Sequence, residues 1–228
     1  MPRHLHPSRS GAAVGVRIPG SAHHETSRSE IVREANMNLG IFGGTFNPPH
    51  VGHLITAERV GDALGLDSIL FIPSFISPHK QEGEERTAEH RLAMTRLAAA
   101  ENPRFAVSDI EIQRPEPSYT IETVRSLRHE RPEDHLFLII GMDNFLTFHL
   151  WKEPKELLRS AALVVMNRPL YPKRVNEVLG TENVQFVDVP GIDVSSSEIR
   201  RRVHQGESIR YLVPQSVEAY IHQHALYR

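Results

Sequence analysis

Two short apolar runs constrain the fold of this chain more than any other feature. Residues 136–140 (LFLII) and 163–166 (LVVM) are apolar at every position, whereas a half-buried strand alternates apolar and polar residues. Such continuous runs are typical of strands in a parallel sheet that is covered by helices on both faces. Because stretches with helical spacing separate the apolar runs, we predict an α/β fold with a doubly wound parallel sheet.

The elements expected from the pattern alternate along most of the chain. Strands are expected over residues 38–44, 67–74, 104–112, 135–141, 162–168 and 184–190. Helices are expected over residues 51–64, 87–102, 118–130, 154–161, 195–206 and 213–227, with Thr87 as the expected cap of the second. The sequence contains no internal repeat, so this alternation indicates one domain.

The first 36 residues differ from the rest in composition. They are rich in Arg, His, Ser, Gly and Pro and show no sustained period, so we expect a disordered leader over residues 1–36 and a folded domain over residues 37–228. A transit peptide is disfavoured because such peptides are poor in acidic residues, and this stretch contains Glu25, Glu30 and Glu34. Met37 directly precedes the first strand, so a chain that starts there should stay soluble and active.

Composition excludes several classes of protein. The formal net charge is −2, so bulk attraction to nucleic acid or to an anionic membrane is not indicated. There are no cysteines, which excludes disulfides, thiolate metal sites and cysteine nucleophiles. No apolar stretch approaches the ~20 residues of a membrane span. We expect a cytoplasmic protein that binds neither nucleic acid nor membrane, and the sequence carries no signal of its oligomeric state.

The stretch GIFGGTFNPPHVGH, at residues 40–53, indicates a ligand-binding loop. Ligands of doubly wound sheets bind beyond the carboxyl ends of the strands, and Gly43 and Gly44 let the backbone approach a ligand there. The following helix offers free N–H groups to a phosphate, and His50 and His53 share its first turn. A glycine turn beside two helix-end histidines is the alternative reading, and two histidines are too few ligands for a metal site.

A second stretch, VSSSEIR at residues 194–200, has the chemistry of a phosphate-binding helix start. Ser195 and Glu198 are spaced for a capping box, and Arg200 adds positive charge beside the serine hydroxyls. Taken alone, the stretch is equally typical of an ordinary capped helix. The pair of stretches resembles the two signatures of the nucleotidyltransferase superfamily with a His-x-Gly-His motif, from whose second signature Val194 and Ser197 depart conservatively.

Segments between the two signatures resemble one family, the bacterial nicotinate-nucleotide adenylyltransferases. They are FIPSFISPHK at residues 71–80, PSYTIETV at residues 117–124 and GMDNFLTFHLW at residues 141–151. The resemblance covers roughly residues 38–227 and implies a Rossmann-like nucleotidyltransferase fold. It further implies transfer of an adenylyl group from ATP to nicotinate mononucleotide, giving deamido-NAD and pyrophosphate in NAD biosynthesis. Mg²⁺ is expected to accompany ATP, held mainly by phosphates and water.

The resemblance also implies roles for individual residues of this sequence. The implied catalytic residues are His50, His53, Lys80 and Arg200. The implied ATP-binding residues are Gly43, Gly44, Thr45, Phe46, Ser195, Ser196, Ser197 and Ile199. The implied nicotinate mononucleotide-binding residues are Asn47, Tyr119, Thr120, Asp143 and Trp151. Structural readings compete with several of these roles, since Lys80 fits a surface loop and a lone tryptophan is more often part of a core.

Three other functions stay open. Nicotinamide mononucleotide or, with less support, phosphopantetheine could be the acceptor in place of nicotinate mononucleotide. A non-catalytic nucleotide sensor could use the same fold, although the presence of both histidines, Lys80 and Arg200 argues against it. The basic run RRRV at residues 200–203 is weak support for nucleic-acid binding, because a solvated helix face explains it.

Overall fold

The computed structural model describes residues 36–75, 88–114, 118–167 and 184–228. The expectations for the leader, for Thr87 as a cap and for Lys80 as a phosphate ligand therefore fall outside the described residues. All statements below concern the described part of the chain.

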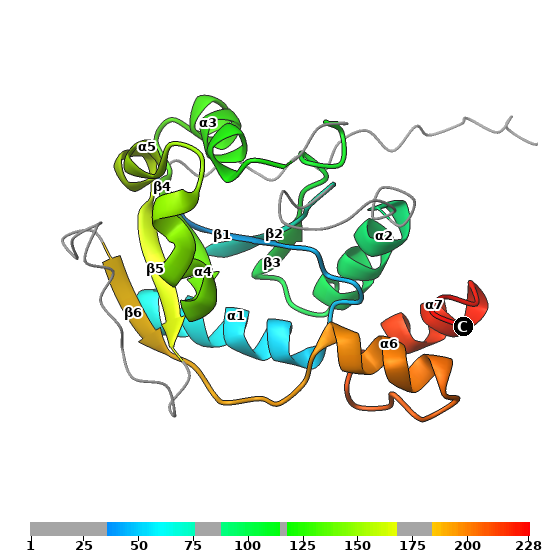
Figure 1. Cartoon of the computed structure of the whole chain (residues 1–228). Coiled ribbons are helices and arrows are strands. Elements are labelled where there is room, and N and C mark those ends of the chain that lie inside the picture. Colours follow the sequence, from blue (N-terminus) through cyan, green and yellow to red (C-terminus); the bar gives the residue numbers. More distant parts are fainter. Residues whose placement is uncertain (1–35, 76–87, 115–117, 168–183) are drawn as a thin grey trace, which may run out of the picture. The chain divides into compact units, whose positions relative to one another are not determined.

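One parallel sheet of six strands forms the centre of the described domain, in the order β3-β2-β1-β4-β5-β6 (Figure 1). The strands are β1 (Asn38–Gly44), β2 (Ser68–Pro73), β3 (Phe105–Val107), β4 (His135–Gly141), β5 (Ala162–Asn167) and β6 (Val184–Asp188). The chain first adds β2 and β3 on one side of β1 and then adds β4 to β6 on the other. The predicted doubly wound sheet is thereby confirmed, and its switch point lies between β1 and β4.

The helices alternate with these strands along the chain. They are α1 (Val51–Leu64), α2 (Ala88–Ala99), α3 (Thr120–Glu130), α4 (Met142–Thr147), η2 (Phe148–Leu150), α5 (Pro154–Ser160), α6 (Ser196–His204) and α7 (Gln215–Gln223). Glycine ends α1, because Gly65 adopts the left-handed conformation at its C-cap with φ of 60°. None of these described helices is both long and apolar enough to cross a membrane.

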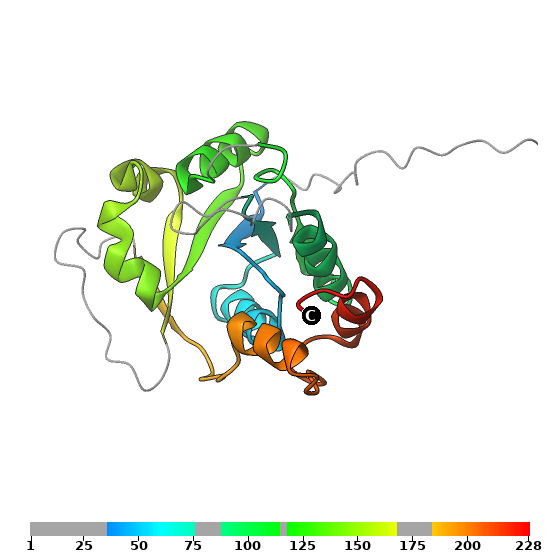
Figure 2. The ribbon, with the colours of Figure 1, turned by 45° about the vertical axis from the view of Figure 1, so that its right-hand side comes forward.

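Apolar side chains on both faces of the sheet hold the helices in place. On one face, Ile121, Val124 and Leu127 of α3 are buried against β1, β4 and β5, together with Leu157 of α5. On the opposite face, Ala57 and Val60 of α1 pack against the phenylalanines of β1 and β2. A third cluster joins α2, α6 and α7 beside the sheet (Figure 2). The C-terminal helices are therefore anchored by their own core, close to the start of α1.

The third strand is shorter than the sequence predicts. We expected residues 104–112, but β3 ends at Val107, which pairs with Phe71. Its neighbour β2 ends at Pro73, which has no N–H group to extend the ladder, and no strand formed by the described residues lies on the other side of β3. Residues 108–114 instead form turns, in which the backbone N–H of Gln113 donates to the carbonyl of Asp109. This difference brings Glu111 beside the start of α3.

Candidate active site

Two adjoining cavities lie where the central strands end. The first has a volume of about 470 Å³ and the second of about 980 Å³. Phe42 of β1 and Gly141 at the end of β4 line both of them. The cavities therefore meet at the switch point of the sheet, where doubly wound folds bind ligands.

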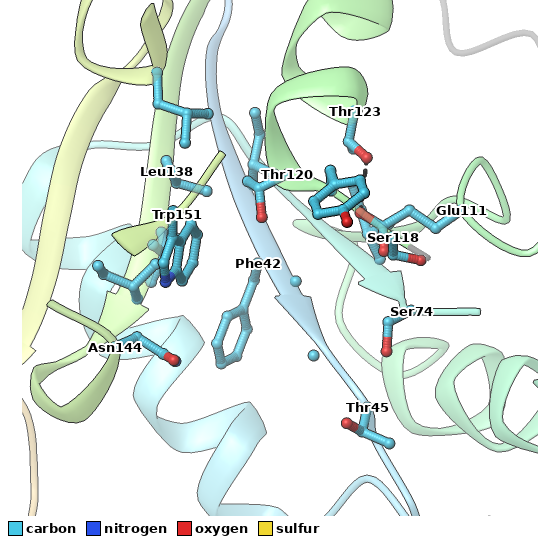
Figure 3. Close-up of a pocket in the computed structure, with 18 of the residues that line it drawn as sticks. Phe42, Thr45, Ser74, Glu111, Ser118, Thr120, Thr123, Leu138, Asn144 and Trp151 are labelled. Carbon is cyan, nitrogen blue, oxygen red and sulfur yellow. Dashed lines mark hydrogen bonds between the residues drawn. The ribbon is translucent and has the colours of Figure 1, made fainter. Parts of the chain in front are cut away.

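The first cavity lies between the carboxyl ends of β1 and β4, the start of α3 and the segment after η2. Figure 3 shows Glu111, Ser118 and Thr123 on one side, with Trp151 and Asn144 on the other and Phe42 between them. The wall of this cavity also contains Gly43, Gly44 and Thr45. Aromatic and hydroxyl groups thus share a space suited to a flat polar ring.

The second cavity is lined by the beginnings of three helices. His50, Gly52 and His53 come from the start of α1, Met142 and Asp143 from α4, and Ser195 and Ser196 from α6. Helix N-termini carry free N–H groups and the positive end of the helix dipole. Their convergence on one cavity suits an anionic ligand.

His50 and His53 stack on each other at the first turn of α1. Their ring centroids are 3.7 Å apart and the rings are inclined by 26°. The backbone N–H of His50 donates to Nδ1 of His53 at 3.2 Å, so the single proton of a neutral His53 ring belongs on Nε2. Burial, aided by the neighbouring His50 ring, lowers the pKa of His53 from 6.5 to about 3. His53 is therefore neutral at physiological pH in the free protein and offers an Nε2–H donor.

The ring of Phe46, one of the implied ATP-binding residues, belongs to the core. The residue is 2% exposed and has φ of 48°, and its ring meets those of Phe42, Phe71 and His53 at 5.7, 5.6 and 5.1 Å. A Cβ on Gly44 would come within 3.0 Å of the same ring. Any contact of Phe46 with a nucleotide is therefore left to its backbone, and Gly44 is required for the packing beneath the loop.

Four side chains from distant elements hold the loop between Gly44 and His50. Arg91 of α2 donates to the carbonyl of Thr45 at 2.8 Å, and Arg200 of α6 donates to the carbonyl of Asn47 at 2.7 Å. The hydroxyl of Ser196 donates to the carbonyl of Pro48 at 2.9 Å. Near the C-terminus, the hydroxyl of Tyr227 donates to Oδ1 of Asn47 at 2.6 Å. This loop, called the glycine loop below, is thus held by Arg91 of α2, by two residues of the second signature and by Tyr227 near the C-terminus.

The start of α6 combines capping with contact to this loop. Oγ of Ser195 accepts from the backbone N–H of Glu198 at 3.2 Å, which is half of the predicted capping box. The Glu198 carboxylate instead pairs with Arg201 at 2.6 Å. Ser197 accepts from Arg200 at 3.2 Å, and Ile199 is fully buried, so its side chain serves the core. A triphosphate would meet Arg200 only through guanidinium N–H groups outside these two bonds.

The residues expected at the mononucleotide divide between the two cavities. Tyr119, Thr120 and Trp151 all line the first cavity, and Trp151 packs on Phe148 with ring centroids 5.0 Å apart. Asp143, in contrast, lines the second cavity, while its neighbour Asn144 lines the first. Asn47 lines neither of the two cavities, because its side chain is turned to Tyr227.

Several residues of this region were missed by the sequence reasoning. They are Arg91, Glu111, Asn144, Lys152 and Tyr227. Lys152 lines the first cavity, donates to Glu122 at 2.9 Å and lies 4.7 Å above the Tyr119 ring. Arg91 shares the helical spacing of the buried residues Ala88, Thr95 and Ala98, which is a signal that could have been used. The others come from turns, from the chain end or, for Asn144, from the six-residue helix α4, and none of these carries a clear periodic pattern.

Comparison with known proteins places this geometry in a family. The profile of the cytidylyltransferase-like family matches residues 41–202. A protein of Salinibacter ruber, named as a probable nicotinate-nucleotide adenylyltransferase, is 42% identical over 192 residues, which are 84% of this chain and 98% of that protein. A protein of Thermus thermophilus with the same name is 45% identical over 84% of this chain and its own full length. The chain belongs to the nicotinate-nucleotide adenylyltransferase family.

Solved structures agree with this family at the level of the fold. The nicotinic acid mononucleotide adenylyltransferase of Plasmodium falciparum in complex with NaAD superposes with a TM-score of 0.69 at 18% identity, covering 84% of this chain and 98% of that one. Its complex with APC gives a TM-score of 0.66. The α/β nucleotidyltransferase fold predicted from the sequence is therefore confirmed for this adenylyltransferase-family member.

The bond between Tyr227 and Asn47 leads to a prediction about this family member. Replacement of Tyr227 with phenylalanine should lower the free energy of unfolding by about 1–2 kcal/mol, because the part-buried Oδ1 of Asn47 loses its donor. Urea denaturation would measure the change. Tyr211→Phe is the control, since Tyr211 is 84% exposed and should change stability little. Equal stability of Tyr227→Phe and the parent would contradict the prediction.

Proposed function

We propose that this protein transfers the adenylyl group of ATP to nicotinate mononucleotide, producing deamido-NAD and pyrophosphate. The observation that carries the proposal is the pair of adjoining cavities that share Phe42 and Gly141. One has an aromatic and hydroxyl lining suited to a pyridine ring, and the other gathers helix N-termini suited to a triphosphate. Two substrates bound in them would bring their phosphates together beneath the glycine loop.

The chemistry requires no general base. A phosphate oxygen of the mononucleotide attacks the α-phosphorus of ATP, the bond from that phosphorus to the β-bridging oxygen breaks, and pyrophosphate leaves with the electron pair. The nucleophile is already anionic, so the protein must hold two anions in line and stabilise the charge that grows on the phosphates. Helix termini and preorganised donors supply that stabilisation.

His53 and His50 are the proposed donors to the reacting phosphates. In its neutral form His53 would donate from Nε2, since its Nδ1 already accepts the backbone N–H of His50. The lowered pKa of His53 supports a neutral donor. A donor of fixed orientation costs little reorganisation when charge develops.

Further roles follow from the family resemblance and remain proposals. Lys80 and Arg200 would hold the β- and γ-phosphates, and Gly43, Thr45, Ser195 and Ser196 would line the ATP. Mg²⁺ is the proposed partner of ATP and would neutralise the triphosphate when bound. Among the described residues, no group of three or more His, Asp or Glu side chains could hold a metal ion. The phosphates and water are therefore the proposed ligands.

The acceptor can be identified by pyrophosphate release with ATP and Mg²⁺. Parallel assays would contain nicotinate mononucleotide, nicotinamide mononucleotide or phosphopantetheine. The proposal predicts the highest kcat/KM with nicotinate mononucleotide. Preference for another acceptor would keep adenylyl transfer but overturn the proposed substrate. ATP binding without turnover of any acceptor would favour the nucleotide sensor.

The bare backbone of Gly43 provides a second test of the first cavity. A Cβ added to Gly43 would meet no atom within 4 Å, and the residue lines that cavity. Gly43→Ala should therefore keep the stability of the parent but raise the KM for at least one of the two substrates by about 10-fold, because the added methyl group would occupy space in the first cavity. Steady-state kinetics and thermal unfolding would be measured together. Gly44→Ala is the contrasting variant, which should lose stability through contact with Phe46.

The expected cytoplasmic location is also part of this proposal. Fractionation of cells that express the full chain would test it, and recovery of the activity from a membrane or organelle fraction would contradict it. The same fractions would show whether residues 1–36 are retained.

A further inference from the structure

A buried carboxylate in the first cavity has no part in the reaction described above. Glu111 lies in the turns that follow β3, is 7% exposed and lines this cavity beside Ser118 and Thr123 (Figure 3). Burial raises the pKa of its carboxyl group, and this cost is partly offset by hydrogen bonds from the two hydroxyls and by the charge of Arg114. A buried carboxylate needs hydrogen-bond donors or positive charges that compensate for its lost hydration, and those of Glu111 are specific residues.

Hydrogen-bond directions show what the carboxylate does for its neighbours. The guanidinium of Arg114 donates to Oγ1 of Thr123 at 2.9 Å. The hydroxyl of Thr123 therefore points its own hydrogen at Glu111 and donates to Oε1 at 2.7 Å. The backbone N–H of Phe75 donates to Oγ of Ser118 at 3.0 Å, so the hydroxyl proton of Ser118 is likewise directed to Glu111. Two hydroxyl donors therefore converge on one acceptor group.

These two hydroxyls stand on either side of the residues expected to meet the acceptor. Ser118 precedes Tyr119 and Thr120, and Thr123 follows them on the first turn of α3. The N-cap residue of α3 is Tyr119, whose side chain makes no capping hydrogen bond. Glu111 thus holds the start of α3 from outside the helix through these two side-chain hydroxyls, and not by capping its backbone N–H groups.

The bond from Phe75 connects the same group to β2. Phe75 is the last described residue before the segment that carries Lys80, and its carbonyl accepts from Arg91 at 2.9 Å. The network around Glu111 therefore joins the end of β2, the turns after β3 and the start of α3. All three meet at the wall of the first cavity opposite Trp151 (Figure 3).

We propose that Glu111 is a positioning residue for the acceptor nucleotide. By accepting from Ser118 and Thr123 it fixes Tyr119 and Thr120 in the wall that faces the pyridine ring, and so sets affinity for the acceptor without contributing to ATP binding. The inference rests on the proposed function, because it assigns the first cavity to the mononucleotide.

Glu111→Gln tests the proposal with little change in side-chain volume. The amide keeps one acceptor oxygen in place of two, so one hydroxyl loses its partner. We expect the KM for nicotinate mononucleotide to rise about 10-fold, while the KM for ATP and kcat stay within about 2-fold, as for loss of one buried hydrogen bond that acts on substrate binding. Asp109→Asn is the matched control, since Asp109 lies in the same turns, contacts Arg96 and lines neither cavity.

A binding measurement separates this inference from the proposed function. Trp151 is the only tryptophan of the chain and lines the first cavity, so its fluorescence can report binding of nicotinate mononucleotide. A parent protein that neither binds nor turns over this acceptor would overturn both proposals. A parent that binds it with the same Kd as Glu111→Gln would overturn only the positioning role. Equal increases in the KM values for acceptor and ATP would overturn that role as well.

Thr123→Val provides an independent test of the proposal if Glu111→Gln does not fold. It removes the hydroxyl that donates to Glu111 and preserves the branched shape of the side chain. The same selective loss of acceptor affinity is expected. In the double variant the two effects should be clearly less than additive, since both changes remove one network. Additive effects, or an unchanged Kd for the acceptor in Thr123→Val, would contradict the proposal.

Discussion

Replacement of His53 with alanine should lower kcat by about 100-fold, as expected for loss of one preorganised donor to a developing charge. The KM for either substrate should change far less, because the contact strengthens as charge moves onto the phosphates. The neutral ring is held by the backbone of His50 through Nδ1, which leaves Nε2–H as its donor, and His53 lines the second cavity. Single-turnover pyrophosphate release would measure the chemical step directly.

A matched control for this variant is His222→Ala on α7, because His222 is exposed and lines neither cavity. It should keep the kcat of the parent. A kcat for His53→Ala within a few-fold of the parent would remove His53 from the chemistry. His53→Asn retains a side-chain donor of similar reach, so partial recovery of kcat is expected.

The pKa of His53 also predicts how its contribution to stability depends on pH. The folded value, about 3, is below the value of 6.5 for an unperturbed histidine, so the unfolded chain takes up this proton first as pH falls. The stability associated with neutral His53 is fully present above pH 6.5 and is lost as pH falls from there towards 3. The difference in unfolding free energy between parent and His53→Ala should therefore shrink over that window.

Replacement of Arg91 with methionine should lower the free energy of unfolding by about 3 kcal/mol or more, since two part-buried carbonyls lose a charged donor that is itself fully buried. Arg91 is fully buried and donates to the carbonyls of Thr45 and Phe75 at 2.8 and 2.9 Å. Methionine preserves much of the apolar stem, so the cost reflects the lost hydrogen bonds. For a domain of this size a loss of 3 kcal/mol corresponds to a fall in Tm of roughly 6–12 °C.

Thermal and urea unfolding of Arg91→Met would be compared with those of Arg96→Met. Arg96 lies on the same helix, its side chain is 57% exposed, and its only ion pair among the described residues is with Asp109 at 3.3 Å. That control should change stability by less than about 1 kcal/mol. If the two variants were equally stable, the hydrogen bonds of Arg91 would not contribute to holding the glycine loop.

The sequence predicted much of the fold because its strongest signals are local. The continuous apolar runs became β4 and β5, both buried in the sheet, and the spacing of Ile121, Val124 and Leu127 became the buried face of α3. The predicted strand over residues 104–112 was too long, because its alternating pattern could not reveal that the neighbouring strand ends at Pro73. The short helix α4 was missed, since six residues contain too few turns for a clear period.

The sequence by itself determined the sheet class, the two signature stretches and the family, because glycine spacing, helix-start chemistry and apolar runs are properties of neighbouring residues. Only the tertiary structure decided that Tyr227 meets Asn47 across 180 residues and that Glu111 holds the start of α3. It also decided that Asp143 and Asn144 line different cavities. Such contacts depend on how turns and chain ends pack on a completed sheet, and no local period encodes that packing.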